Sequence, residues 1–380
     1  MAIVFSSPAF VADPAAAGTH ALIVGVGEYP FLDGGKNEVP NNPFGLKQLK
    51  SSPISARGVR DWMTATGAYA GNARAGLNNP AAPLATVECL ISDAAPPAGE
   101  AVDDPKAGTF RKVFYEWLAR CDANPGNVAF LYLCGHGLRM KDLVFLASDF
   151  GEPIPNRWIR AFSLDSIRLG MRKSKARSQF MFFDCCRTYP SSFSDPAAQG
   201  EQLFDSFLDH ADDRGYAALY STQDGSYAFA KPDEPSYFTR ALIDGLLGYG
   251  AERRAGAWLV TNKMINKALQ DIMSFDLRVA PNLQVIPGES PGHATLHVLK
   301  HVPTVRIQMK CDPLARMNEV EFSGSRAAVN FVHPGSAGPL RRDVEPGEWK
   351  LVMAHRDNLF APIVDDALVA PPIYDRTFQI

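Results

Sequence analysis

The chain of 380 residues is poor in cysteine and carries no large surplus of charge of either sign. Six cysteines are too few for the dense disulfide framework of a small secreted scaffold, and no two stand in the Cys-x-x-Cys spacing of structural zinc sites. A net charge of -3 and a sequence pI near 6.3 give no electrostatic reason to expect nucleic-acid or acidic-membrane binding. We therefore expect a polypeptide or small-molecule partner, with no nucleic-acid polymer and no membrane.

Long apolar runs are also missing, and none approaches the roughly 20 residues that a membrane-spanning helix requires. Residues 1–17 start apolar and end rich in alanine, as signal peptides do, but they contain no Lys or Arg, and Ser6-Ser7-Pro8 interrupts the apolar stretch. We interpret them as the N-terminal extension of a cytoplasmic, reduced protein. The length suits one large domain and a smaller one.

Apolar strand-like runs alternate with helical patterns over most of the chain. The expected strands cover 19–27, 85–91, 128–134, 143–147, 179–183 and 217–221, and the expected helices cover 54–63, 110–121, 159–172, 238–247 and 260–272, the last with Thr261 as a cap. This alternation predicts an α/β fold with a mostly parallel central sheet flanked by helices. In such sheets, sites form beyond the carboxyl ends of the strands.

The pattern changes at two places. Residues 188–215 are polar and acidic and predict a long mobile linker. From about residue 301, short alternating runs at 305–309, 320–322, 328–331 and 349–352 are separated by Pro and Gly turns, which predicts a small antiparallel β-sandwich-like domain over 301–380.

Two predicted strands end in chemically capable residues: Leu131–Cys134 leads into Gly135-His136-Gly137, and Phe182-Phe183 into Asp184-Cys185-Cys186-Arg187. A thiol becomes a strong nucleophile when a neighbouring imidazole takes its proton. Glycine lets backbone N–H groups approach a developing oxyanion, so the N–H groups of Gly137 and Cys186 are the expected donors. Taken alone, two buried thiols and a structural histidine would be the commoner interpretation.

Both segments resemble motifs of the caspase-like cysteine peptidases, specifically the prokaryotic metacaspase and orthocaspase branch of the caspase–haemoglobinase clan. Cys-Gly-His-Gly resembles the family's His-Gly motif, Asp184-Cys185-Cys186 resembles its Asp-Cys-Cys motif, and the separation (186 − 136 = 50) matches the roughly 50 residues of caspases. The resemblance covers most of residues 20–300. It implies a caspase-like domain over 18–300, with a large-subunit half (18–187) and a small-subunit half (216–300), Cys186 as nucleophile and His136 as acid and base.

The resemblance also implies a substrate preference. Metacaspases carry Asp two residues before the nucleophile and cut after Arg or Lys, and that position is Asp184 here. Ser55 stands where the family has a further aspartate, and Ser221 opens the small-subunit match, so both are expected at the substrate pocket. Arg187 replaces the family's usual histidine. We predict cleavage after Arg, with Lys second; the alternative is that Asp184 only caps a backbone turn.

The sequence offers fewer indications of how the peptidase would be activated. Arg214 follows Asp212-Asp213 at the end of the linker and is the predicted self-cleavage site. Those acids and Asp103-Asp104 could bind calcium, as in some metacaspases. Adjacent acidic residues are more often solvated side chains on the surface, so the sequence implies no certain cofactor. The C-terminal domain is the expected site for a small-molecule or protein activator. A role in bacterial antiviral defence or regulated death is implied by relatives alone.

Two other functions stay open. The first is a peptidase-fold binding or scaffold protein whose C-terminal β-domain recruits partners, with weak or no proteolysis. The second is a nucleotide-binding protein that uses Gly25-Val26-Gly27, although the full Gly-x-Gly-x-x-Gly pattern and a suitably placed acid are missing. The intact His and Cys pair favours the peptidase.

Overall fold

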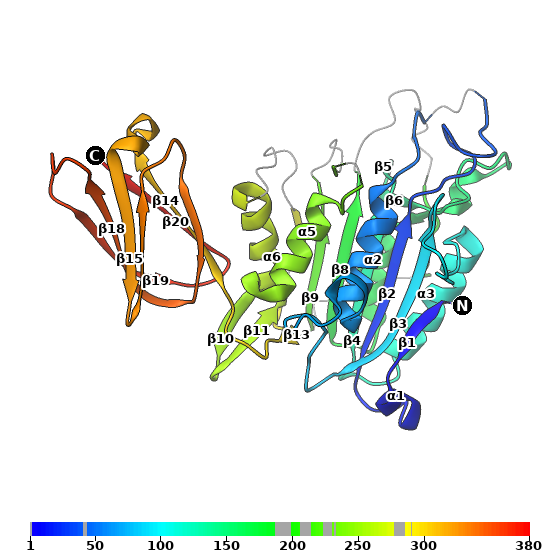
Figure 1. Ribbon diagram of the computed structural model, residues 1–380. Helices are drawn as coiled ribbons and strands as arrows, with labels where there is room; N and C mark the ends of the chain where they lie inside the picture. The colour runs from blue at the N-terminus through cyan, green and yellow to red at the C-terminus, as the bar shows by residue number, and fades with distance from the viewer. Residues whose placement is uncertain are drawn as a thin grey trace.

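The computed structural model describes residues 2–40, 44–186, 199–205, 214–222, 230–231, 233–276, 286–289 and 291–380. Its centre is a seven-stranded sheet in the order β1-β3-β2-β4-β8-β9-β12 (Figure 1). The inner strands run parallel, and the two edge strands are antiparallel to their neighbours. The bounds are β1 Ile3–Ser6, β2 Thr19–Val26, β3 Leu84–Ser92, β4 Val128–Gly135, β8 Ser178–Cys185, β9 Gly215–Tyr220 and β12 Ile286–Glu289.

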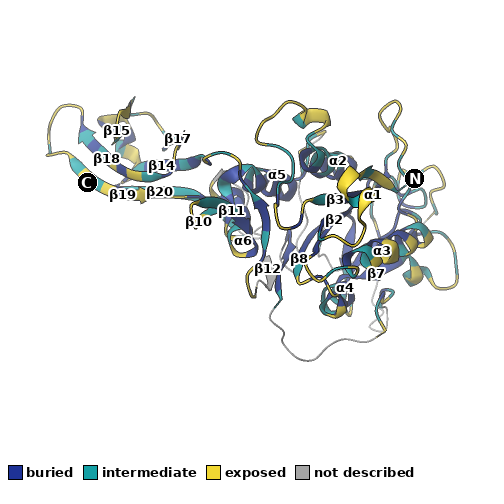
Figure 2. Cartoon of the chain, turned by 90° about the horizontal axis from the view of Figure 1, so that it is seen from below, coloured by how far each residue is buried: buried dark blue, intermediate teal, exposed yellow. Residues whose placement is uncertain are grey.

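The inner strands are apolar at nearly every position because helices cover both faces of the sheet. In β2, Leu22 and Val24 belong to one core, and Ala21 and Ile23 belong to the other. Figure 2 shows α2 and α5 on one side of the sheet and α3 and α4 on the other. The helix bounds are α2 Ser51–Thr64, α3 Ala107–Cys121, α4 Leu164–Gly170, α5 Tyr237–Asp244 and α6 Asn262–Asp271. The predicted α/β fold with a largely parallel sheet is confirmed.

The predicted helix over 159–172 is wrong as a single element. Residues Ala161–Ser163 form strand β7, which pairs with β6 (Leu143–Leu146), and α4 begins only after Ser163, whose Oγ accepts a hydrogen bond from the Ser166 N–H at 3.1 Å. Pairing between strands leaves no mark in local apolar spacing. The predicted cap at Thr261 is confirmed, because its Oγ1 accepts from the Met264 N–H at 3.3 Å.

Two segments that the sequence analysis left outside the peptidase body pack against it. Residues Ile3–Ser6 form β1 at the sheet edge, and the short helix α1 (Pro8–Ala12) follows it. Within the predicted linker, Glu201 pairs with Arg111 of α3 at 2.6 Å, and the Leu203 carbonyl accepts from the Tyr115 hydroxyl at 2.8 Å. This part of the linker is therefore held on α3; residues 187–198 and 206–213 lie outside the described residues.

The C-terminal module consists of two sheets that share one core, in the orders β17-β14-β20 and β16-β15-β18-β19. Ile307 and Phe378 of the first sheet are buried with Phe322 and Leu351 of the second. The predicted all-antiparallel arrangement is wrong at one point, because β14 and β20 run parallel. The bounds are β14 Val305–Asp312, β15 Val320–Arg326, β16 Val329–Pro334, β17 Leu340–Val344, β18 Gly347–His355, β19 Ile363–Val369 and β20 Ile373–Gln379.

A three-stranded sheet joins the two parts of the chain. It consists of β10 (Ala251–Arg254), β11 (Ala257–Thr261) and β13 (Thr295–Val298), and it lies beside α6 on the side of the C-terminal module (Figure 1). No helix in the described ranges is long and apolar enough to cross a membrane.

Candidate active site

The two predicted catalytic residues follow neighbouring strands at matched positions. Gly135, the last residue of β4, pairs with Cys185, the last residue of β8. His136 and Cys186 are therefore the next residues on two chains that lie about 4.8 Å apart. Both strands end at the carboxyl edge of the sheet, where the α/β architecture places binding sites. The fold thus brings together two residues that are 50 positions apart (186 − 136).

Gly137 touches the backbone of the predicted nucleophile. A Cβ atom on this residue would lie 2.4 Å from the Cys186 carbonyl oxygen and 3.0 Å from the Cys185 Sγ. Such distances leave no room for a side chain, so glycine is required here. Cys185 is buried and packs on the core that contains α3 and α4, whereas Cys186 is partly exposed. This difference in exposure supports Cys186 as the thiol that substrate can reach.

The N–H group of Gly137, the predicted oxyanion donor, points away from the neighbouring strand. The Leu146 N–H donates to the His136 carbonyl at 3.0 Å, and the next pair in the ladder between β5 (Gly137–Arg139) and β6 is Gly137 opposite Phe145. Antiparallel ladders alternate hydrogen-bonded with non-hydrogen-bonded pairs, so Gly137 directs its N–H away from β6. That donor remains for a ligand.

The His136 ring is oriented by a backbone carbonyl. Its Nε2 lies 2.6 Å from the Lys47 carbonyl oxygen. A carbonyl only accepts, so Nε2 carries the proton and Nδ1 is left with its lone pair. The ring is buried, and burial lowers the pKa of His136 to about 4, against the opposing effect of the hydrogen bond to Lys47. The imidazole is therefore neutral at pH 7 and able to accept a proton.

Tyr29 positions this histidine and was not among the predicted site residues. Its hydroxyl accepts the His136 backbone N–H at 2.8 Å, and the two ring centroids lie 4.8 Å apart. The Gln48 side chain bonds the Tyr29 backbone in both directions, at 2.7 and 3.0 Å, and so holds the neighbouring Lys47 carbonyl in place. The sequence signal was weak: a tyrosine two residues beyond the end of a glycine-rich strand.

Asp184 is almost fully buried, and its Oδ2 is the centre of a hydrogen-bond network. Four side chains, from β4 and from the start of α5, donate to this oxygen: Tyr132 at 3.2 Å, Cys134 at 3.5 Å, Thr239 at 2.8 Å, and Ser236. Burial raises the pKa of Asp184, and the bonds from Ser236 and Thr239 act in the opposite direction. No described residue donates to Oδ1. Among the described residues, the donors to Asp184 are side chains rather than the backbone N–H groups of a turn.

Ser55 and Ser221 flank this network at its two ends. The Ser55 Oγ on α2 accepts the Ser236 N–H at 2.9 Å, so it reaches Asp184 only through Ser236. The Ser221 Oγ donates to the Cys185 carbonyl at 3.2 Å, one strand away from the nucleophile. Ser236 and Thr239 at the start of α5 are site residues that the sequence analysis missed. Their Ser-x-x-Thr spacing at a helix start signalled a cap but not a contact with Asp184.

Gly25 and Gly27 serve helix packing. A Cβ on Gly25 would lie 2.6 Å from the Ala56 Cβ on α2, and one on Gly27 would lie 2.3 Å from the Leu49 carbonyl oxygen. The space that a bound phosphate would need is filled by the chain leading into α2 and by α2 itself. The nucleotide-binding interpretation therefore loses its one supporting motif.

The remaining predicted residues lie apart from the pair. The Arg214 guanidinium donates to the carbonyls of Met171 and Ser174, both at 3.0 Å, and the bond after Arg214 enters buried β9. Asp104 accepts a hydrogen bond from the Ser148 Oγ at 2.5 Å. Among the described residues, no group of three or more His, Cys, Asp or Glu side chains could hold a metal ion. Arg187, Asp212 and Asp213 lie outside the described residues.

Comparison with known proteins identifies similar sequences and folds. A curated "probable protease" of a Desulfuromonadales bacterium is 25% identical over 368 residues, which cover 87% of this chain and 40% of the relative. The crystal structure of caspase-1 from Spodoptera frugiperda matches with a TM-score of 0.40 at 12% identity and covers 74% of this chain and 91% of that one. The model of the caspase domain matches residues 19–285. Since that match includes both strand ends and well over half of the residues, the chain belongs to the caspase-domain family of cysteine peptidases.

Proposed function

We propose that the protein is a cysteine endopeptidase that cuts polypeptides after Arg, and less well after Lys. The observation that carries the proposal is the register of β4 and β8, which sets His136 beside Cys186 with the Gly137 backbone against the Cys186 carbonyl. The same edge offers a base, a thiol and a free backbone N–H, which are the three groups that acyl transfer requires.

The chemistry follows from which atoms are available. Because burial keeps His136 neutral, its Nδ1 accepts the Cys186 proton as the sulfur attacks the substrate carbonyl carbon. The oxyanion receives hydrogen bonds from the N–H groups of Gly137 and Cys186. The imidazolium then protonates the leaving amine, and a thioester joins Cys186 to the acyl half of the substrate. Water, deprotonated by His136, hydrolyses the thioester and restores the thiol.

Preference for a basic side chain is supported by Asp184. Oδ2 is saturated by hydroxyl and thiol donors, whereas Oδ1 accepts no hydrogen bond from the described residues. A guanidinium reaching the pocket would find this second oxygen oriented and desolvated. Ser55 carries no charge at the position where the family has an aspartate, so Asp184 is the carboxylate that we expect to bind the basic side chain. A guanidinium is more weakly hydrated than an ammonium group and so enters a buried site more readily, which favours Arg over Lys.

The test is a panel of fluorogenic peptides with Arg, Lys or Asp at the position before the cut. We expect turnover in the order Arg, Lys and then none for Asp. Cys186→Ala removes turnover, and Cys185→Ala, the matched control one residue away, retains it. Turnover that persists in Cys186→Ala, or cleavage after Asp, contradicts the assignment of the nucleophile or of the pocket.

Activation by a ligand or partner and a role in bacterial defence or regulated death stay proposals that rest on the family resemblance. Self-cleavage after Arg214 needs one step more than the sequence suggested, since the guanidinium must leave the Met171 and Ser174 carbonyls to enter an active site. Mass spectrometry of the purified chain, with Cys186→Ala as control, tests for a cut at this residue.

A further inference from the structure

We propose that the cleft between the peptidase part and the C-terminal module binds a small organic anion with an aromatic body. Two hollows of about 370 and 450 Å³ open at this junction. They share Arg253, Trp258 and Pro346 among their lining residues, so they adjoin one another, and the two together are called the cleft here. The volume of each lies in the range of small-molecule sites, and no residue of the catalytic edge lines either one.

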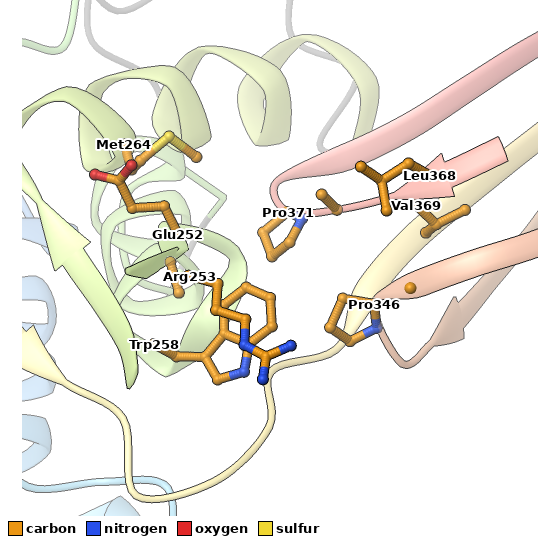
Figure 3. Close-up of a pocket in the computed structure, with 11 residues that line it drawn as sticks. Glu252, Arg253, Trp258, Met264, Pro346, Leu368, Val369 and Pro371 are labelled. Carbon is orange, nitrogen blue, oxygen red and sulfur yellow. The ribbon is translucent and has the colours of Figure 1, made fainter. Parts of the chain in front are cut away.

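The first hollow is lined mostly by apolar side chains from both parts of the chain. Figure 3 shows Trp258 and Met264 on the peptidase side, across the gap from Pro346, Val369 and Pro371 of the C-terminal module. An indole and two prolines are flat, stiff surfaces that lose little conformational entropy when another ring packs on them. This lining favours a planar, apolar body over a flexible polar one.

The charges of the cleft favour an anion. Its two carboxylates are already neutralised: Glu252 pairs with Arg254 at 3.1 Å, and Glu345 pairs with Arg326 at 3.0 Å. Arg253 and Lys300 also line the cleft, and neither forms an ion pair with any described residue. His301 adds no charge near neutral pH, because burial lowers its pKa. The cleft therefore holds two cations without a counter-charge.

The flat surface and the free cation lie side by side. Arg253 of β10 and Trp258 of β11 are directly opposite partners in an antiparallel pair, which places their side chains on the same face. A ring stacked on Trp258 would carry its carboxylate or phosphate within reach of the Arg253 guanidinium, whose paired N–H groups suit either anion. Such a ligand would touch both parts of the chain and stabilise their contact.

Lys263 offers a matched control for Arg253. It is an exposed residue of α6 next to Met264, and it lines neither hollow. Arg254 is unsuitable as a control, because its loss would leave Glu252 of the cleft without its ion-pair partner. Changing Arg253 or Lys263 to Gln removes one positive charge in either case. A second cleft variant, Ala370→Phe, fills the first hollow from an exposed position and leaves the folded core untouched.

The experiment titrates the full-length Cys186→Ala chain with the fluorescent aromatic anion anilinonaphthalene sulfonate, so that binding is read independently of peptidase activity. We expect one saturable site that is weakened about tenfold by Arg253→Gln, lost in Ala370→Phe and unchanged in Lys263→Gln. Bound probe should also raise the melting temperature of the parent chain more than that of Arg253→Gln.

Competition experiments distinguish a carboxylate ligand from a phosphate ligand, and they measure how much the negative charge contributes to binding. Naphthoate and naphthyl phosphate should each displace the probe, and the stronger competitor identifies a carboxylate or a phosphate ligand. Uncharged phenylnaphthylamine should bind about tenfold more weakly and be insensitive to Arg253→Gln. Probe binding of equal strength in the parent, Arg253→Gln and Ala370→Phe chains, or no saturable binding to the parent, overturns the proposal.

Discussion

Gly137 and Cys186 meet backbone to backbone: a Cβ on the glycine would lie 2.4 Å from the carbonyl oxygen of the cysteine. The contact is possible only because β4 and β8 end in register, with Gly135 opposite Cys185. It couples the position of the proposed nucleophile to the position of the proposed oxyanion donor. Three expectations follow from this contact and from the groups around it, and a fourth follows from a buried histidine elsewhere in the fold.

Gly137→Ala should lower kcat/KM for an Arg substrate about 100-fold or more, because the methyl group must push the Cys186 carbonyl away and shift both oxyanion donors. Gly108→Ala is the matched control: the same methyl is added on α3, where it meets no atom within 4 Å. Steady-state kinetics on both variants check the expectation. A Gly137→Ala enzyme that keeps wild-type kcat/KM would show that the contact does not bear on catalysis.

Ser236→Ala should weaken binding of Arg substrates, mainly as a roughly tenfold rise in KM, because Asp184 loses a buried hydroxyl donor. Since that bond lowers the pKa of Asp184, its loss should move the acid side of the KM profile to higher pH. Ser236→Thr restores the hydroxyl and should rescue both effects. Ser166→Ala, which removes a buried hydroxyl without a described partner, should change neither. If the pH profile of KM does not shift in Ser236→Ala, the role of Ser236 is limited to capping α5.

Activity should persist at acid pH. A histidine with an ordinary pKa of about 6.5 would be only about 3% neutral at pH 5, and kcat would fall roughly 25-fold between pH 7 and pH 5. Burial lowers the pKa of His136 to about 4, so the neutral base still dominates at pH 5. The measurement is kcat over this range at saturating substrate, because kcat/KM also reports the titration of Asp184, whose pKa is raised by burial. A fall that follows a pKa near 6.5 would contradict the buried, neutral imidazole.

Folding stability should fall on acidification because of His297. This residue is 3% exposed, its Nδ1 accepts the Asn78 N–H at 2.9 Å, and burial lowers its pKa to about 4. Above pH 6.5 it is neutral in both the folded and unfolded chains and adds no pH dependence. Below that, the unfolded chain binds the proton first, so the free energy of unfolding falls by about 2 kcal/mol at pH 5.

His297→Gln keeps an acceptor for the Asn78 N–H but cannot titrate. Urea unfolding of the two chains at pH 7.5 and pH 5 therefore isolates the contribution of this residue. The variant should lose about 2 kcal/mol less than the wild type between the two conditions. Equal losses in both chains would show that His297 is already protonated, or exposed, in the folded state.

Much of the fold and the ends of the catalytic strands could be predicted from the sequence. Parallel strands that are covered on both faces must be apolar throughout, so residues 19–27, 128–134 and 179–183 could be predicted as strands. The reactive residues that follow the last two of these strands indicated where the sheet edge lies. Period-2 runs likewise revealed the C-terminal sheets. The parallel pairing of β14 with β20 and the strand at Ala161–Ser163 escaped, because the choice of partner leaves no local pattern.

Residue types and their order along the chain thus determined the α/β architecture, the candidate nucleophile Cys186 and the candidate base His136. Only the tertiary structure decided what surrounds them. The Lys47 carbonyl that selects the His136 tautomer is a backbone atom, which every residue possesses, and Ser236 reaches Asp184 from 52 positions away. The cleft around Trp258 needs two separate parts of the chain to form its walls. Contacts made by backbone atoms, or between distant segments, depend on how the chain closes on itself, and no local stretch of sequence records that.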